Sequence, residues 1–199
     1  MFINIPGLFF RPRQQWQRVS DKLPGSLPAV LVYPLVMALL PAIAWYNGTV
    51  NVGWKLGDGD IVRLTHDSAV PMIVLFYLVM VLAVIGIGYM VHWMSATYGA
   101  ESTVVKGIAI AALTATPLFV AGAVGFLPNF WLDLLVGIIA VCYAVYLLYL
   151  GVPIVMGVPE ERGFLFASAV VSVCLVALVA IMGVSIIMWD MGAAPSFTD

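Results

Sequence analysis

The chain has 199 residues, of which 63% are hydrophobic and only 9% are charged, and its formal net charge is −2. These charges are too few to keep a soluble domain of this length dispersed, so the composition predicts an integral membrane protein. Because no excess of basic residues is available to meet phosphates, nucleic acid is excluded as a partner.

The first 26 residues come before any long apolar run. A short apolar stretch with aromatic side chains is followed by Arg11, Arg13, Arg18 and Lys22. This order is the reverse of a secretory signal, in which the basic residues come first. Aromatic residues beside cations are typical of a segment lying on a membrane surface, so we expect an interfacial segment here.

Five apolar runs follow, each long enough to cross a bilayer as a helix. They cover residues 27–46, 69–93, 107–126, 131–156 and 164–189. The chain contains neither internal repeats nor a second domain. We therefore predict an all-α membrane protein with five transmembrane helices in a single domain over residues 1–199.

Prolines interrupt the first and third runs. Pro34 and Pro41 predict a kink in the first helix, because each frees the carbonyl four residues upstream. In the third, Thr114 and Thr116 precede Pro117, and threonine hydroxyls near a proline can satisfy the carbonyl that it frees. Such breaks build substrate sites in some transporters, but helix packing explains them without a ligand.

Residues 47–68 form the only long polar connection. Trp54 lies in an alternating segment, and a Gly-Asp-Gly-Asp turn separates that segment from a second extended stretch, so we predict a small extracytoplasmic β-hairpin between helices 1 and 2. The candidate metal ligands are Asp58, Asp60, His66 and Asp67. Their spacing does not match an EF-hand, and Gly-Asp-Gly is common in turns, so we assign no metal and keep a metal-dependent outer-face activity as a third hypothesis.

The fourth run carries tyrosines in its second half. At helical spacing, one face of this segment carries a stripe formed by Cys142, Tyr146, Tyr149 and Pro153. Tyrosine hydroxyls need partners, so this stripe is expected to face other helices or the interface rather than lipid tails. We assign helix packing to Tyr146, Tyr149, Gly151 and Pro153, and also to Pro117 in the third helix.

Tryptophans stand near the ends of several runs. Indole rings favour the headgroup zone, so we interpret Trp16, Trp54, Trp93 and Trp131 as interfacial anchors.

The distribution of positive charge predicts the topology. Five crossings place the termini on opposite sides, and cytoplasmic loops carry the excess of Lys and Arg. With the N-terminus in the cytoplasm and the C-terminus outside, six of the eight basic residues fall inside: Arg11, Arg13, Arg18, Lys22, Lys106 and Arg162. Only Lys55 and Arg63 then lie outside.

Several blocks of the sequence resemble the Yip family of Ypt/Rab-interacting membrane proteins, in particular its bacterial inner-membrane members. The resemblance extends over nearly the whole chain. It is carried by Gly7-Leu-Phe-Phe-Arg-Pro12, Gly53-Trp-Lys-Leu-Gly-Asp-Gly59, Ala115-Thr-Pro-Leu-Phe119 and Tyr146-Leu-Leu-Tyr-Leu-Gly-Val-Pro153. It implies five helices with a cytoplasmic N-terminus, in a multi-pass protein of the bacterial inner membrane. Eukaryotic members bind small GTPases largely through a long cytosolic N-terminal region, and the short segment here argues against GTPase binding.

No catalytic motif is present, and no charged residue lies deep inside an apolar run, which argues against an enzyme and against an ion-coupled pump. We expect neither enzymatic activity nor a cofactor. The partners we expect are the lipid bilayer and other membrane proteins, including a second copy of the chain. We therefore predict a non-enzymatic membrane scaffold or partner-binding protein. The alternative is a channel or uncoupled carrier for a small neutral or lipid-like solute.

Overall fold

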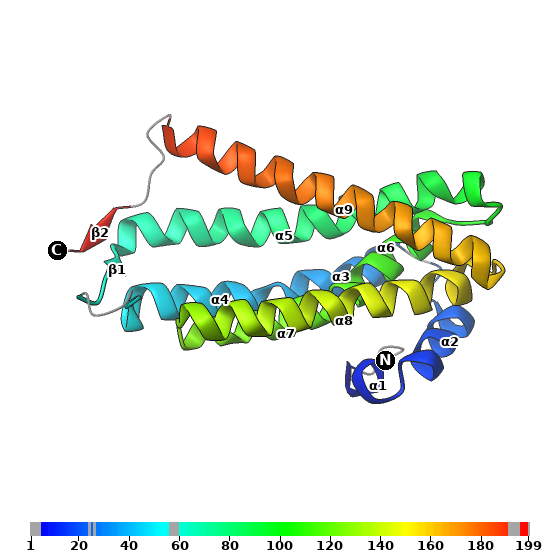
Figure 1. Cartoon of the computed structure of the whole chain (residues 1–199), viewed down its shortest axis with the longest axis horizontal. Helices are drawn as coiled ribbons and strands as arrows, with labels where there is room; N and C mark the ends of the chain where they lie inside the picture. The colour runs from blue at the N-terminus through cyan, green and yellow to red at the C-terminus, as the bar shows by residue number, and fades with distance from the viewer. Residues whose placement is uncertain (1–4, 24, 26, 56–59, 191–195, 199) are drawn as a thin grey trace.

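Five helical spans are arranged side by side along the longest axis of the molecule (Figure 1). The computed structural model describes residues 5–23, 25, 27–55, 60–190 and 196–198. Within these residues the spans that are long and apolar enough to cross a membrane are Leu27–Val52, His66–Tyr98, Val104–Phe126, Phe130–Met156 and Glu160–Ile187. The prediction of five spanning helices is confirmed. The side of the membrane on which each end lies stays a prediction.

Three of the spans rest on long helices, and two are built from shorter pieces. The long helices are α5 (His66–Ser95, continued by the 3₁₀-helix η2, Ala96–Tyr98), α8 (Phe130–Met156) and α9 (Glu160–Met188). The first span consists of α3 (Leu27–Met37), α4 (Leu39–Asn47) and the π-helix η1 (Gly48–Val52). The third consists of α6 (Val104–Thr114), α7 (Thr116–Ala121) and the 3₁₀-helix η3 (Gly122–Phe126).

The breaks in the first and third spans are caused by proline. The first span breaks at Ala38 and the third at Ala115. Pro41 cannot donate a hydrogen bond to the carbonyl of residue 37, and Pro117 cannot donate one to the carbonyl of residue 113. Each break therefore falls between a proline and the carbonyl it leaves free, as predicted for Pro41, whereas Pro34 lies inside α3 without ending it.

Glycines allow the spans to cross closely at both ends of the bundle. A Cβ atom on Gly107 would collide with the carbonyl oxygen of Gly88, which brings α6 against α5. At the other end, a Cβ atom on Gly48 would collide with the carbonyl oxygen of Gly125, and one on Gly122 with Pro41. Small residues bring membrane helices together in this way because packing, rather than burial from water, drives their association.

The connection between the first two spans pairs with the end of the chain. Trp54 and Val62 form an isolated antiparallel bridge, with N to O distances of 2.8 and 2.9 Å. Strand β1 (Arg63–Leu64) pairs antiparallel with β2 (Phe197–Thr198), which returns from the end of α9 (Figure 1). The predicted hairpin is therefore represented among the described residues by this one bridge, and its extracytoplasmic position stays a prediction.

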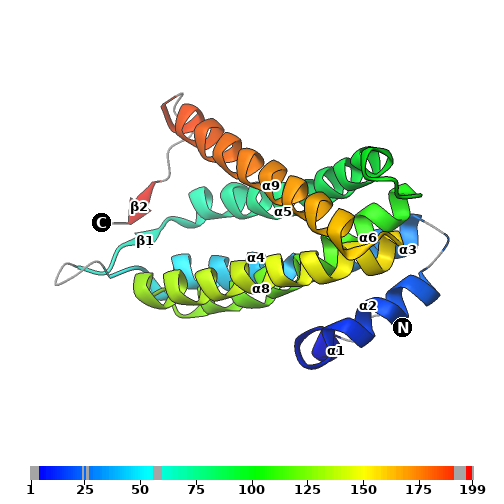
Figure 2. The same ribbon diagram turned by 45° about the vertical axis from the view of Figure 1, so that its right-hand side comes forward.

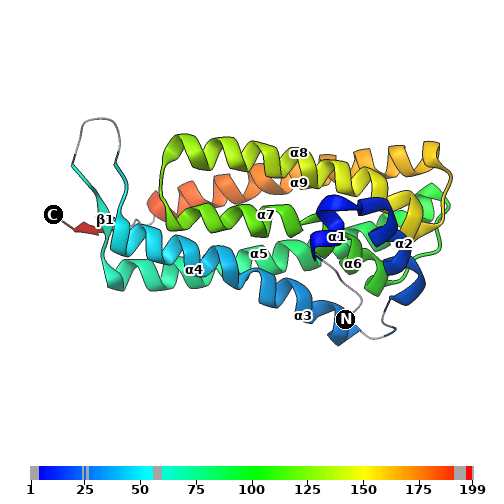
Figure 3. The ribbon, with the colours of Figure 1, turned by 90° about the horizontal axis from the view of Figure 1, so that it is seen from below.

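Two short helices at the N-terminus, α1 (Ile5–Phe10) and α2 (Pro12–Lys22), lie across one end of the bundle, and we call them the arm (Figure 3). The side chains of Leu8, Trp16 and Val19 are fully buried. These three side chains are therefore part of the hydrophobic core, whereas Phe10 of the same arm is 85% exposed.

Helix α9 packs on the bundle only at its beginning. Phe166, Ala167 and Val170 are buried. From Leu175 to Ile187 every side chain is exposed or half-buried. Figure 2 shows the reason: α9 diverges from α5 and α8 towards the end that carries β1 and β2.

Candidate functional site at the N-terminal arm

The half of α8 that carries the tyrosines is the part on which the arm and the start of α9 converge. Helix α8 begins at the side chain of Asn129, whose oxygen accepts from the backbone N–H groups of Trp131 and Leu132 at 3.1 and 3.2 Å. It ends at Gly157, which has the left-handed conformation (φ 65°) that glycine adopts without strain. Between these ends α8 presents its tyrosines to two different neighbours.

Tyr143 holds the first helix of the arm. Its hydroxyl donates to the carbonyl oxygens of Leu8 and Phe9, at 2.9 and 3.1 Å. Its ring also stacks on that of Phe9, with centroids 5.5 Å apart and planes 8° apart. Tyr143 is not among the predicted packing residues, because the predicted stripe on α8 passes through its neighbour Cys142.

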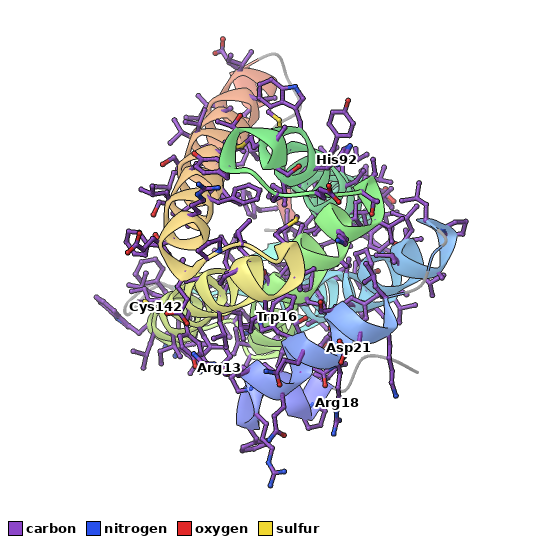
Figure 4. The ribbon with its side chains drawn as sticks, turned by 90° about the vertical axis from the view of Figure 1, so that its right-hand side faces the viewer. Arg13, Trp16, Arg18, Asp21, His92 and Cys142 are labelled. Atoms are coloured by element: carbon purple, nitrogen blue, oxygen red, sulfur yellow. The ribbon has the colours of Figure 1, made fainter. Side chains whose placement is uncertain are left out.

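Trp16 holds the second helix of the arm. An ideal Cβ atom on Gly151 would lie 2.5 Å from Cε2 of Trp16, so the indole occupies the notch that the glycine leaves in α8. The sequence predicted Trp16 as an interfacial anchor, but its ring is 0% exposed. It therefore anchors the arm to protein instead of to headgroups, because the notch offers the indole close contact on an apolar helix. Figure 4 shows Trp16 between the arm and α8.

Tyr149 holds the beginning of α9. Its hydroxyl lies 2.8 Å from Oγ of Ser168. Since the Ser168 hydroxyl donates to the carbonyl of Phe164 at 2.9 Å, it accepts from Tyr149. Pro153 contributes to the same contact, because Gly163 lies directly against it. Tyr149, Gly151 and Pro153 thus all make contacts between elements of one chain.

A cleft of about 550 Å³ remains between the arm and the turn from α8 to α9. Arg13 and Gln17 line it from the arm, and Glu160 and Phe164 line it from α9. The wall formed by α8 consists of Tyr146, Tyr149, Leu150, Pro153 and Ile154, and Val158 closes the turn. Tyr146 is half exposed, so the predicted stripe continues from buried contacts into an open surface.

A second, smaller hollow of about 290 Å³ lies within the arm itself. It is lined by Pro6, Gly7, Phe10, Arg11, Gln14, Gln15 and Arg18. Two of the arm's cations thus face this hollow, and a third, Arg13, faces the larger cleft.

A buried polar contact joins the first span to the third beside its break. The hydroxyl of Tyr33 lies 2.7 Å from Oγ1 of Thr116, which is fully buried beside Pro117. Oγ1 of Thr116 also donates to the carbonyl of Ala112 at 3.4 Å. Thr116, next to Pro117, therefore joins the first and third spans, and the packing role of Pro117 itself stays a prediction.

The remaining predicted anchors differ in their surroundings. Trp54 stacks on Trp45, with ring centroids 5.5 Å apart. Trp93 and Trp131 are 69% and 75% exposed on the protein surface. Their contact with headgroups stays a prediction.

Three of the candidate metal ligands, Asp60, His66 and Asp67, lie at the end of the bundle opposite the arm. Asp58 lies outside the described residues. Nδ1 of His66 lies 2.7 Å from the hydroxyl of Tyr46, so that ring nitrogen is already engaged. The described part of the chain contains no group of three or more His, Cys, Asp or Glu residues arranged to hold a metal ion, and Asp60 and Asp67 are part of no such group.

Comparison with known proteins gives a consistent result over nearly the whole chain. The Yip1 domain matches residues 7–181. The chain is 33% identical over 189 residues to the inner membrane protein YohC of Escherichia coli strain K12, and equally to that of Escherichia coli O6:H1. These matches cover 95% of this chain and 97% of each relative. No solved structure matches.

Proposed function

Because the chain belongs to the Yip1 family and is a multi-pass inner membrane protein, we propose that it is a non-enzymatic scaffold that binds other membrane helices through the outer half of α9. We define the outer half of α9 as residues 175–187. The resemblance of the sequence to the Yip family agrees with the match to the Yip1 domain.

The observation that carries the proposal is the lack of any buried side chain in the outer half of α9. A helix on the edge of a bundle normally packs one face on its neighbours and leaves the other to lipid. Here side chains separated by half a turn, such as Val176 and Leu178, are both exposed, so no face of the helix is buried against a neighbour. The surface available for packing is therefore larger than that of the other spans.

A second copy of the chain is the partner we propose. The outer half of α9 contains Ala177, Ala180 and Gly183 among larger aliphatic side chains, and a Cβ atom on Gly183 would have open space around it. Small residues allow close approach between membrane helices, and the branched side chains around them supply the packing contacts.

A channel or uncoupled carrier is less well supported by the same geometry. That alternative rests on the kinks, where a solute would need space. Around Pro41 the chain is close packed, because Gly122 lies against its ring, and Gly125 lies against Trp45, with an ideal Cβ atom 2.8 Å from Cδ1 of that indole. The two kinked spans pack closely against each other near Pro41 and leave little room for a solute there. This packing favours a structural role for the prolines.

Disulfide cross-linking in native membranes tests the proposal. In a background without Cys142 and Cys174, a cysteine replacing Val179 is expected to give a disulfide-linked dimer under mild oxidation. The matched control is Ile139→Cys, which places an equally lipid-accessible cysteine on α8. If Val179→Cys gives no dimer, or if both positions cross-link equally, self-association through α9 is refuted.

A further inference from the structure

We infer that the cleft between the arm and the turn from α8 to α9 binds the headgroup of an aminophospholipid, with its phosphate at Arg13 and its ammonium at Glu160. The inference is independent of self-association through α9, because the cleft lies at the other end of that helix.

The cleft is at the depth of the lipid headgroups. Helix α8 has 27 residues, which correspond to about 40 Å of helix, against about 30 Å of hydrocarbon. Its last turns therefore reach the interfacial region, and the cleft is formed around those turns. Glu160, Glu161 and Arg162, which follow immediately, are charged residues that belong in water or among headgroups.

The two charges of the cleft are opposite and both are available. Arg13 lies on α2, and Glu160 lies in the first turn of α9. Within the described residues, neither side chain has a hydrogen bond or an ion pair. A guanidinium group binds phosphate oxygens with paired N–H donors, and Gln17 beside it adds another donor.

Glu160 decides which phospholipid fits. A carboxylate accepts hydrogen bonds from a primary ammonium, which offers three donors. A choline headgroup carries the same charge without N–H donors, and a glycerol headgroup leaves its phosphate with Arg13 but brings no cation to the carboxylate of Glu160. A cation and an anion facing one cleft therefore match a zwitterion with a primary amine better than an anionic or a fully methylated headgroup.

The rest of the lining is suited to an acyl chain. Tyr146 and Phe164 are both at least half exposed, and with Leu150 they continue the wall of the cleft onto the apolar surface of the bundle. A small soluble zwitterion would leave these rings uncovered. A lining that combines two opposite charges with exposed apolar rings therefore suits a lipid.

The cleft is held open by the contacts that fix its walls. Tyr143 and Trp16 secure the arm, and Tyr149 secures the start of α9 through Ser168. A preformed site avoids the cost of ordering its walls when the ligand binds.

Native mass spectrometry of the full chain with lipids of identical acyl chains tests the inference. The probes are phosphatidylethanolamine, phosphatidylcholine and phosphatidylglycerol. The wild type is expected to bind phosphatidylethanolamine most tightly. Arg13→Gln is expected to weaken that binding about tenfold, which corresponds to the loss of one charge-assisted hydrogen bond. It should also weaken the binding of phosphatidylglycerol. Glu160→Gln is expected to weaken only phosphatidylethanolamine.

Two variants serve as matched controls. Arg18→Gln removes a cation from the same helix that faces the smaller hollow, and Glu161→Gln removes an acid next to Glu160 that does not line the cleft. Both should bind phosphatidylethanolamine like the wild type. Figure 4 shows Arg13 and Arg18 at separate places on the arm. The inference is overturned if the wild type shows no headgroup preference, or if the controls lose binding as Arg13→Gln and Glu160→Gln do. Because all four side chains are exposed, folding should be preserved throughout.

Discussion

The contact between Trp16 and Gly151 can be tested by adding a single methyl group. In Gly151→Ala the new Cβ atom would lie 2.5 Å from Cε2 and 2.6 Å from Cζ2 of the indole. Both atoms belong to a rigid, fully buried ring, so the clash cannot be relieved by a small rotation of a flexible side chain. We expect Trp16 to leave the notch and to loosen α2.

The change in the free energy of unfolding caused by Gly151→Ala is the sum of two opposing contributions. Overpacking a core costs about 1–3 kcal/mol. Replacing glycine by alanine inside a helix gains up to about 1 kcal/mol from backbone propensity. Gly137→Ala, in the same helix and with nothing within 4 Å of its Cβ atom, carries only the second term. The free energy of unfolding of Gly151→Ala should therefore fall about 1–3 kcal/mol below that of Gly137→Ala.

The assay is the free energy of unfolding in bicelles, measured by steric trapping, together with hydrogen exchange of the α2 amides. Exchange in α2 should be faster in Gly151→Ala and unchanged in Gly137→Ala. A Trp16→Ala background gives the decisive comparison, because the indole is then absent and Gly151→Ala should behave like Gly137→Ala. A penalty for Gly151→Ala that persists on this background would refute the reasoning.

Three further predictions concern single contacts. Tyr149→Phe should lower the free energy of unfolding by about 0.6 kcal/mol and at most about 1.7, and a double-mutant cycle with Ser168→Ala should recover the same coupling energy if the two hydroxyls interact. Tyr143→Phe should speed hydrogen exchange in α1 without changing exchange in the outer half of α9, and unchanged exchange in α1 would argue against the arm contact. Gly88→Ala should cost about 1–3 kcal/mol of unfolding free energy because the methyl group meets the backbone of α6, whereas Gly86→Ala, whose Cβ atom meets nothing within 4 Å, should not.

The spans were predictable because the bilayer imposes a length and a composition on each of them. The ends of the spans were harder to predict, because hydropathy does not register the polar residues that also belong to a helix. α9 begins at Glu160, four residues before the apolar run, because carboxylates are stabilised at the positive end of a helix. α5 likewise begins at His66, before the predicted residue 69, and Asp67 lies in its first turn.

The position of the arm could not be predicted because two environments attract the same sequence. Aromatic and basic side chains suit a membrane surface, and they suit equally well a groove on the protein at the level of the headgroups. The distinguishing residue is Gly151, since a glycine within a spanning helix indicates a close neighbour. The sequence does not identify that neighbour. In the structure it is Trp16, which lies 135 residues earlier in the chain.

The sequence predicted the tyrosine stripe as a packing face but not its partners, and within the stripe Cys142 and Tyr146 are exposed while Tyr149 contacts α9. A hydroxyl inside a membrane needs an acceptor, and Tyr149 finds one on α9. Tyr143 was not included because the period of a helix permits several stripes through one cluster, and the stripe that starts at Cys142 passes beside Tyr143, although Tyr143 lies three residues before Tyr146 and its ring is 5.6 Å from that of Tyr146. Side-chain periodicity therefore identifies the polar edge of α8 but leaves the choice among its tyrosines open.

The contacts of α8 couple three parts of the molecule that the sequence treats separately. Tyr143 binds the arm, Tyr149 binds the first turns of α9, and Tyr146 lies between them in the wall of the cleft. A lipid bridging Arg13 and Glu160 would join the arm and the start of α9 from the outside, as the tyrosines join them from within. Since a ligand that binds only the folded arrangement stabilises it, phosphatidylethanolamine should slow hydrogen exchange in both α2 and the beginning of α9. Protection of one without the other would mean that the two charges do not share a headgroup.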